Sequence, residues 1–450
     1  MIKKHFILRL LSEKLTLLLA LVTVHVSAIC ATAFADSLDV SGKLEFVANP
    51  NMTHWSSTNQ NLCVSRLCMT LFPYQGKIYL SGGDWNANSG PCPIFAIDPK
   101  NGKVTNEYAA GTESVWHFRP GSDGRLYVPG VDLKENSRNK GAYFRRDVDG
   151  TWTNMMNCAK GNISELGWEG YFMHIWDLVC WKGKVFTAGY GISYGDERTD
   201  KMFTDATPCL TNCVIAFNLR KKLDDGTEKL IQRKAFRRFE AFLSFPDELF
   251  CYPLAYMPSD RNENSCPIEE WRFDEDAGIF ICQTNVWKNL FPDNGPCEFF
   301  GRGRQASIPQ CVIPFKGKCA YLVAAEGLKQ RPRALAAATN VNHTVRAILA
   351  RGIPTNTVPV NLTVSDDKIF ALCIRKLDNG SFENSVWASE DADVFTELFT
   401  FRFKDGLPAG AFCKADGMWF FSVGLHFAES YGPRPQYAGQ DGAVYRINKH

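Results

Sequence analysis

The sequence predicts an all-β protein, a β-propeller with seven blades. Seven times along the chain, a turn ending in Gly or Asp introduces a short apolar strand. Most intervals between these turns are about 40 to 60 residues, the length of a four-stranded blade. Aromatic residues make up 13% of the chain, and their flat side chains suit pleated strands better than helices. The turns are anchored at Gly76, Gly124, Gly183, Gly278, Gly317, Asp367 and Asp416.

The first three blades show the strand pattern most clearly. Strands are expected at residues 67–74, 77–81 and 94–97, then at 115–118, 126–129 and 142–146, and then at 175–181, 185–188 and 214–217. A gap of about 95 residues between Gly183 and Gly278 contains either one blade with long insertions or two blades, one without its anchor. The final segment, residues 442–447, is expected to be a strand that closes the ring with the other end of the chain.

The N-terminal segment predicts export. Four basic residues among the first 14 positions precede an apolar run at residues 15–26, and Ala33-Phe34-Ala35, with a small residue on each side of Phe34, precedes Asp36. This order is typical of a secretory signal peptide. We therefore expect residues 1–35 to be a signal peptide and residues 36–450 to be a single propeller domain, secreted to the extracellular space or the periplasm. No later segment is long enough to span a membrane.

The charge balance excludes one class of partner. Removing residues 1–35 changes the formal charge from +2 to about −1, which gives no reason to expect nucleic-acid binding. The locally basic stretch at residues 220–238 is interrupted by acids and is predicted to be a hairpin. We expect a monomer.

Cysteines and Asn-x-Ser/Thr sites fit an exported protein. Sixteen cysteines less Cys30 predict several disulfide bonds and at least one free thiol, with connectivity left open. Close pairs are Cys63 with Cys68, Cys209 with Cys213, and Cys311 with Cys319. No set of cysteines and histidines has the spacing of a zinc site. Surface glycosylation is expected, if the source is a eukaryote, at Asn51, Asn162, Asn342, Asn361 and Asn379.

Two segments resemble a known signature. Residues 389–395 read Ser-Glu-Asp-Ala-Asp-Val-Phe, and residues 145–152 keep an Asp, a Gly, a Thr and a Trp in similar order. These segments resemble the Asp box of sialidase-like (BNR-repeat-like) propellers, with Ala392 and Phe395 as departures. The resemblance implies a structural hairpin far from the catalytic face, and therefore bears on the fold rather than on chemistry.

A propeller places its ligand-contacting loops on one face. The loops that enter the innermost strands and those between second and third strands lie on that face. Candidate catalytic residues there are His117, His174, Tyr190, Tyr194 and Arg198. Candidate substrate-binding residues are Asp84, Trp85, Asn86, Asn88, Arg119, Asp132, Arg304 and His426.

These residue types suit β-elimination on a uronate polymer. A cation or protonated His would neutralise the carboxylate, and a Tyr or His would remove the C5 proton. Several propeller polysaccharide lyases are similar in using His, Tyr and Arg in this way. The alternative for His117 and His174 is that they are packed core residues beside Trp116 and Trp176. The sequence thus predicts a secreted propeller that engages extracellular carbohydrate. If the protein is an enzyme, the activity predicted first is that of a polysaccharide lyase on acidic, uronate-containing glycan.

Two other function classes stay open. Phe118-Arg119-Pro120 is similar to an arginine element of sialidases, and Asp84, Asp132 and Glu197 offer carboxylates for a glycoside hydrolase. The third class is a non-catalytic propeller that binds glycan or protein, because this fold alone does not decide function. No cofactor motif is present. The Asp84 loop has two interpretations. It binds Ca²⁺, or it forms an Asx-turn whose hydrogen bonds are satisfied by its own backbone.

Overall fold

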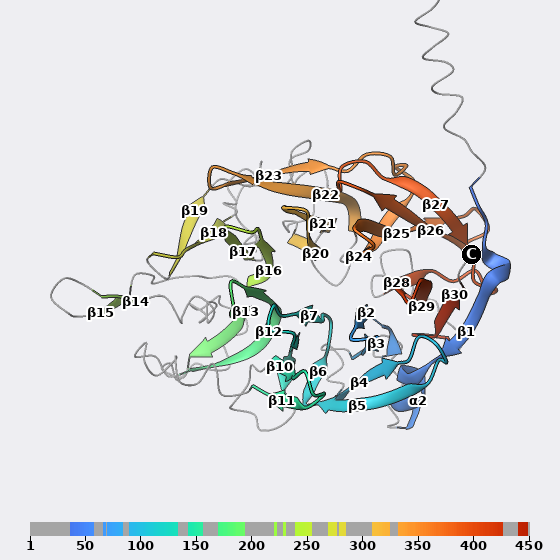
Figure 1. Ribbon diagram of the computed structural model, residues 1–450, viewed down its shortest axis with the longest axis horizontal. Coiled ribbons are helices and arrows are strands. Elements are labelled where there is room, and N and C mark those ends of the chain that lie inside the picture. Colours follow the sequence, from blue (N-terminus) through green and yellow to red (C-terminus); the bar gives the residue numbers. More distant parts are fainter. Residues whose placement is uncertain are drawn as a thin grey trace, which may run out of the picture.

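Strands account for nearly all of the regular structure. The computed structural model describes residues 37–57, 66–68, 70–83, 90–133, 143–155, 170–193, 220–222, 228–230, 239–253, 269–276, 279–284, 308–324, 332–425 and 440–448. Within these residues, seven four-stranded sheets are arranged in a ring, which confirms the predicted β-propeller (Figure 1). The helices η1 (Ser41–Lys43) and α2 (Pro50–Ser57) are short. No helix in this part of the chain is long and apolar enough to cross a membrane.

Six of the sheets have the strand order of propeller blades, in which each strand pairs with the next one of its blade. The first two sheets are β2 (Leu71–Tyr74), β3 (Lys77–Leu80), β4 (Cys92–Ile97) and β5 (Val104–Ala110), then β7 (Arg119–Pro120), β8 (Leu126–Pro129), β10 (Tyr143–Arg146) and β11 (Trp152–Asn154). The next two are β16 (Phe239–Ser244), β17 (Leu249–Pro253), β18 (Glu269–Asp274) and β19 (Ile279–Thr284), then β20 (Ile308–Phe315), β21 (Lys318–Ala324), β22 (Pro332–Val341) and β23 (Thr344–Leu349). The last two are β24 (Val358–Ser365), β25 (Lys368–Lys376), β26 (Phe382–Ser389) and β27 (Thr396–Phe401), then β28 (Ala409–Ala415), β29 (Met418–Val423), β30 (Val444–Ile447) and β1 (Leu44–Ala48).

The remaining four-stranded sheet has a different composition. It joins the long hairpin of β12 (Gly170–Trp181) and β13 (Lys184–Ser193) to two short strands, β9 (Val131–Leu133) and β6 (Thr112–Ser114). The described residues therefore contain six regular blades, and a seventh blade remains a prediction. The predicted hairpin in the basic stretch forms from β14 (Arg220–Lys222) and β15 (Glu228–Leu230).

Tight turns connect the innermost strand of a sheet to the second strand. In the turn between β2 and β3, Gln75 and Gly76 have φ values of 46° and 75°, and Lys316 and Gly317 between β20 and β21 have similar values. Two consecutive positive φ values are typical of the type I′ turns that suit twisted hairpins. These turns confirm the predicted anchors at Gly76 and Gly317, and those at Gly124, Gly183, Asp367 and Asp416 also lie between first and second strands.

The anchor predicted at Gly278 does not have this role. Gly278 lies outside the described residues, and the strand that follows it, β19, is the fourth of its sheet. The corresponding inner turn lies between β16 and β17, where the Phe245 N–H donates to the Glu248 carbonyl at 2.8 Å. Among the described residues, the long gap in the anchors therefore contains β13, the β14–β15 hairpin and the first three strands of the β16–β19 sheet, whose inner turn carries no Gly.

The two ends of the chain close the ring, as predicted. β1 pairs with β30, placing Leu44 opposite Ile447 and Glu45 opposite Arg446. The Arg446 guanidinium binds the Glu45 carboxylate at 3.0 Å, and Asn448 Nδ2 donates to the same carboxylate at 2.7 Å. The N-terminal strand thereby becomes the outermost strand of the C-terminal sheet.

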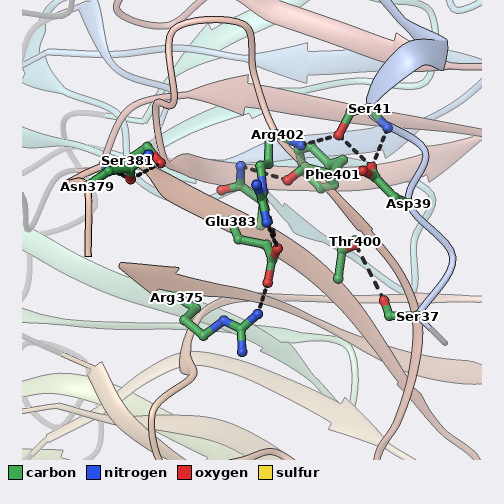
Figure 2. A network of polar contacts seen from close by, with 11 residues as sticks. Ser37, Asp39, Ser41, Arg375, Asn379, Ser381, Glu383, Thr400, Phe401 and Arg402 are labelled. Carbon is green, nitrogen blue, oxygen red and sulfur yellow. Dashed lines mark hydrogen bonds and ion pairs between the residues drawn. The ribbon is translucent and has the colours of Figure 1, made fainter. Parts of the chain in front are cut away.

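Before β1, the chain crosses the neighbouring sheet (Figure 2). The Val40 N–H donates to the Thr400 carbonyl at 2.9 Å, and the Thr400 N–H donates to the Leu38 carbonyl at 3.0 Å, so this segment extends the edge of β27. Beside it, Glu383 accepts from both Arg375 and Arg402. Burial would raise the Glu383 pKa, but these two guanidinium groups hold that pKa below its usual value. The N-terminal segment therefore forms hydrogen bonds with the β24–β27 sheet and, through β1, with the C-terminal sheet.

The hydrophobic core consists of layers between adjacent sheets. One layer lies between the β24–β27 sheet and the C-terminal sheet, where Phe401 and Phe421 have ring centroids 4.3 Å apart. Another lies between the β16–β19 and β20–β23 sheets and contains Tyr252 and Tyr321. Aromatic side chains fill these layers because they bury a large area on flat pleated surfaces.

The predicted disulfide bonds do not form among the described cysteines. Eight of these cysteines are in no disulfide bond: Cys68, Cys92, Cys180, Cys251, Cys311, Cys319, Cys373 and Cys413. The Cys311–Cys319 pairing was wrong because Cys319 lies opposite Pro314 in the β20–β21 register, while Cys311 lies in a bulge. Cys68 is free, and Cys63, Cys209 and Cys213 lie outside the described residues.

The predicted glycosylation sites differ in accessibility. Asn51 is fully buried in α2 and Asn361 is buried in β24, so a glycan fits neither position, and the expectation of surface sites there was wrong. Asn342 and Asn379 lie exposed in turns, where modification remains a prediction. Asn162 lies outside the described residues.

Gly410 in β28 provides a test of how closely the chain packs at the ring centre. A Cβ at Gly410 would lie 1.9 Å from the Gly424 carbonyl oxygen, whereas a Cβ at Gly42 would meet nothing within 4 Å. We expect Gly410→Ala to lower the free energy of unfolding by about 2 kcal/mol or more, because backbone must move to accommodate the methyl group. Gly42→Ala should change it by less than about 0.5 kcal/mol. Urea denaturation of both variants measures this, and equal effects would contradict the packing.

Candidate functional site

The innermost strands meet around the middle of the ring (Figure 1), and the pairing registers show that several of them carry a β-bulge. The pairing register shifts between Ile175 and Asp177 in β12, between Gln310 and Ile313 in β20, and between Ala409 and Ala411 in β28. A bulge interrupts the ladder of hydrogen bonds and leaves backbone N–H and C=O groups for other partners. Side chains from neighbouring innermost strands can therefore bond to this backbone.

Arg119 and Asp177 form an ion pair at this position. Arg119 Nε and Nη2 donate to Asp177 Oδ1 at 3.2 Å and 3.0 Å. Asp177 also accepts the Leu178 N–H at 2.9 Å and the Phe242 N–H at 3.3 Å. Asp177 is buried, so its charge needs the opposite charge of Arg119 and these N–H groups.

Arg119 also reaches a fourth innermost strand. Its Nη1 donates to the Val312 carbonyl of β20 at 3.2 Å. The ion pair thus links β7, β12, β16 and β20, which belong to four different sheets. Three of the five guanidinium N–H groups are used by partners among the described residues, and the side chain is 20% exposed. The remaining N–H groups can donate to a ligand.

His117 lies two residues before Arg119 and is partly buried. Burial is the largest cause that lowers the pKa of His117, the Arg119 charge acts in the same direction and Asp177 opposes the shift, which gives a pKa of about 4. His117 is therefore neutral near pH 7, and Arg119 supplies the cation of the site. The neighbouring Trp116 ring lies 5.0 Å from the Trp176 ring, which brings β12 against the segment that contains His117. Together, His117, Arg119, Asp177 and the Val312 carbonyl are called the axial cluster below.

Cys311 lies beside this cluster. Its φ of 49° places a non-glycine residue in the left-handed region within the β20 bulge, next to Val312. Burial raises the pKa of the Cys311 thiol to about 11, and the Arg119 charge acts in the opposite direction. The thiol is therefore protonated near neutral pH and is a weak nucleophile.

The backbone brings several other predicted residues into one sheet. His174 of β12 lies opposite Tyr190 of β13 and opposite Val131 of β9, the neighbour of Asp132. β9 pairs in turn with β6, which ends three residues before His117. Ser114 of β6 forms a bridge with Gly83, where the predicted Asp84 loop begins. The backbone segments predicted from blades one to three therefore converge.

The remaining predicted residues lie outside the described residues. They are Asp84, Trp85, Asn86, Asn88, Tyr194, Arg198, Arg304 and His426, and the Ca²⁺ expectation for the Asp84 loop shares their status. In the part of the chain that the structure describes, no three His, Cys, Asp or Glu side chains are grouped to hold a metal ion.

Sequence reasoning missed Asp177 and the Val312 carbonyl. One signal for Asp177 was available, because it is a single acid within the apolar strand sequence Ile-Trp-Asp-Leu-Val. A charged residue at such a position is buried with a partner or is not in a core strand. Nothing in the sequence predicts that the Val312 carbonyl accepts from Arg119 rather than from a neighbouring strand, because this depends on the bulge in β20.

Comparisons with known proteins do not assign a family. No family model matches the chain, and no curated protein matches it. Similar solved structures include a proposed gluconolactonase (TM-score 0.40, 10% identity, 92% of this chain and 94% of that chain). A proposed 6-phosphogluconolactonase from Bacteroides fragilis (TM-score 0.39, 12% identity) is covered over 88% of its length by 77% of this chain.

A prolyl endopeptidase structure is also similar (TM-score 0.36, 10% identity, 84% of this chain). The chain spans about half the length of that endopeptidase, 49%. Similarity at this level carries no information on the activity of this protein. The predicted sialidase-like family is not among these neighbours.

The lowered His117 pKa predicts a pH effect on stability. Because the His117 pKa falls from 6.5 to about 4 on folding, the unfolded chain binds the proton first as pH decreases. Stability from this group is present above pH 6.5 and is lost as pH falls toward 4. We expect His117→Gln to reduce the loss of unfolding free energy over this interval, as measured by urea denaturation. A difference between the two proteins that is constant with pH would contradict the assignment.

Proposed function

We propose that the protein is a secreted β-propeller that binds extracellular carbohydrate at the centre of its ring, with the axial cluster as the anchor. The observation that carries this proposal is Arg119, which is held by Asp177 and Val312 while two of its N–H groups have no partner within the described part of the chain. A fixed guanidinium fork donates paired hydrogen bonds to a carboxylate or to neighbouring hydroxyl groups. Uronates present both groups.

The secretion part of this proposal rests on the N-terminal order of basic, apolar and small residues. We also propose that the propeller has seven blades. The seventh would be built around the β12–β13 hairpin, which lies between two regular sheets in the chain and contacts β16. Membership of the sialidase-like family remains a hypothesis based on the two segments that resemble an Asp box.

Binding is favoured over catalysis by the state of His117. A uronate lyase needs a base that removes a weakly acidic C5 proton, and efficiency is greatest when the pKa of that base lies near the working pH. The pKa of His117 is about 4, which makes this side chain a weak base. Lyase or hydrolase activity would therefore depend on other residues, with Tyr190, Tyr194 and Arg198 as the predicted candidates.

Calorimetry with a defined acidic saccharide tests the binding site. We expect the protein to bind trigalacturonate, and Arg119→Lys to weaken that binding about tenfold, because lysine keeps the charge but loses the planar fork. Arg125→Lys is the matched control, since Arg125 lies in the turn before β8 and pairs with Asp123 and Asp147 away from the axial cluster. Failure of the unsubstituted protein to bind trigalacturonate and its methyl ester would overturn the proposal.

Absorbance of unsaturated uronyl products tests whether binding leads to lyase activity. Incubation of the protein with polygalacturonate should give no increase if it is a binding protein without lyase activity. A steady increase that is abolished by His117→Gln would instead make His117 a catalytic residue and contradict the assignment of a weak base. An increase that survives this substitution would direct attention to Tyr190 and Tyr194.

A further inference from the structure

A second ionisable cluster lies away from the axial cluster, between the β16–β19 and β20–β23 sheets. Glu270 of β18 and Tyr252 of β17 are buried, and the core layer around Tyr252 includes Cys319 and Tyr321 of β21. The Phe250–Arg272 and Cys251–Trp271 register continues toward Tyr252 and Glu270. A carboxyl group is therefore enclosed where two sheets pack together.

Among the described residues, Glu270 has one hydrogen bond and no compensating cation. The Tyr252 hydroxyl donates to Glu270 Oε2 at 2.5 Å, while Oε1 is buried and has no partner among the same residues. Burial is the largest cause that raises the pKa of Glu270, the Tyr252 hydrogen bond opposes the shift and the Glu248 charge adds to it, which gives a pKa of about 7. The enclosed position thus favours the protonated, uncharged carboxyl.

The neighbouring carboxylate has the opposite environment. Glu248, also buried, accepts a hydrogen bond from Arg272 Nη1 at 3.3 Å. Asn340 Nδ2 and His343 Nδ1 contact the same carboxylate. Glu248 therefore has several polar partners, whereas Glu270 has only the Tyr252 hydroxyl among the described residues, and this difference favours the proton on Glu270.

We propose that Glu270 is a proton-operated latch between the β16–β19 and β20–β23 sheets. The latch comprises Glu270, Tyr252, Glu248, Cys319 and Tyr321. With a proton on Glu270, the latch is closed and the two sheets pack as described. Loss of that proton leaves a buried negative charge near Glu248, and the interface opens to hydrate the charge. The ionisable groups facing Glu270 are Tyr252, Tyr321, Cys319 and Glu248, with Arg272 and His343 bound to Glu248.

The direction of the pH effect follows from proton linkage. The folded-state pKa of Glu270 is raised from 4.5 to about 7, so the folded protein holds this proton where the opened form has released it. The contribution is fully present below pH 4.5 and is lost as pH rises through about 7. Opening of this interface should therefore increase with pH.

Buried thiols provide a local measurement. Cys319 of β21 belongs to the latch, whereas Cys251 of β17 faces the other side of its sheet, toward Asp177, and Cys373 and Cys413 are buried in the last two sheets. Labelling with a maleimide, normalised to the unfolded chain at each pH, reports opening at each thiol. Between pH 5.5 and 8.5 we expect opening at Cys319 to increase about tenfold more than at Cys251, Cys373 and Cys413.

Substitution separates the latch from general loosening. Glu270→Gln keeps the shape and stays uncharged, so it should remove the excess opening of Cys319 at pH 8.5. Glu390→Gln is the control, because Glu390 is an exposed carboxylate paired with Lys368. An equal pH response at all four thiols in the unsubstituted protein would overturn the proposal even if Glu270→Gln did not fold. Persistence of the excess opening in folded Glu270→Gln would overturn it as well.

Discussion

Closure of the ring is the constraint on which the rest of the structure depends. The core consists of layers between adjacent sheets, such as those around Phe401 and Tyr321, so an open series of sheets would leave two apolar faces in water. β1 prevents this by pairing with β30 and completing the last sheet with residues from the other end of the chain. The contacts of Glu45 with Arg446 and Asn448 therefore stabilise the whole ring rather than one sheet.

Closure also determines the chemistry at the centre. Innermost strands from several sheets come together there, and their bulges leave backbone groups without ladder partners. Asp177 and Arg119 bind such groups on β16 and β20, and their charges compensate each other in a buried position. The same interactions that complete the hydrogen bonding of the strands leave a fixed, partly accessible guanidinium on the axis. Stability and the candidate binding site thus depend on the same residues.

The sequence predicted the local features of this fold and missed the distant ones. The turn at Gly76 was predictable because a positive φ favours glycine, and this signal depends only on residues next to one another in the chain. The turn between Phe245 and Glu248 has no Gly, so the sequence analysis placed the inner turn of the β16–β19 sheet at Gly278, which is the wrong position. Asp177 was missed because its partners Arg119 and Phe242 are 58 and 65 positions away in the chain. The Cys311–Cys319 bond was expected from compartment alone, whereas the strand register decides which thiols meet.

Burial acts on the two ionisable sites in opposite directions for one reason. Removing water disfavours charge, which lowers the pKa of a base such as His117 and raises the pKa of an acid such as Glu270. Acidification therefore acts first on the centre of the ring, and alkalinisation acts first on one interface between sheets. Between about pH 4 and pH 7 both groups are neutral in the folded protein, so neither adds a buried charge. Over this interval the two proton linkages oppose each other: stability from His117 is lost as pH falls, because the unfolded chain takes up that proton, and stability from Glu270 is lost as pH rises, because the unfolded chain releases that proton.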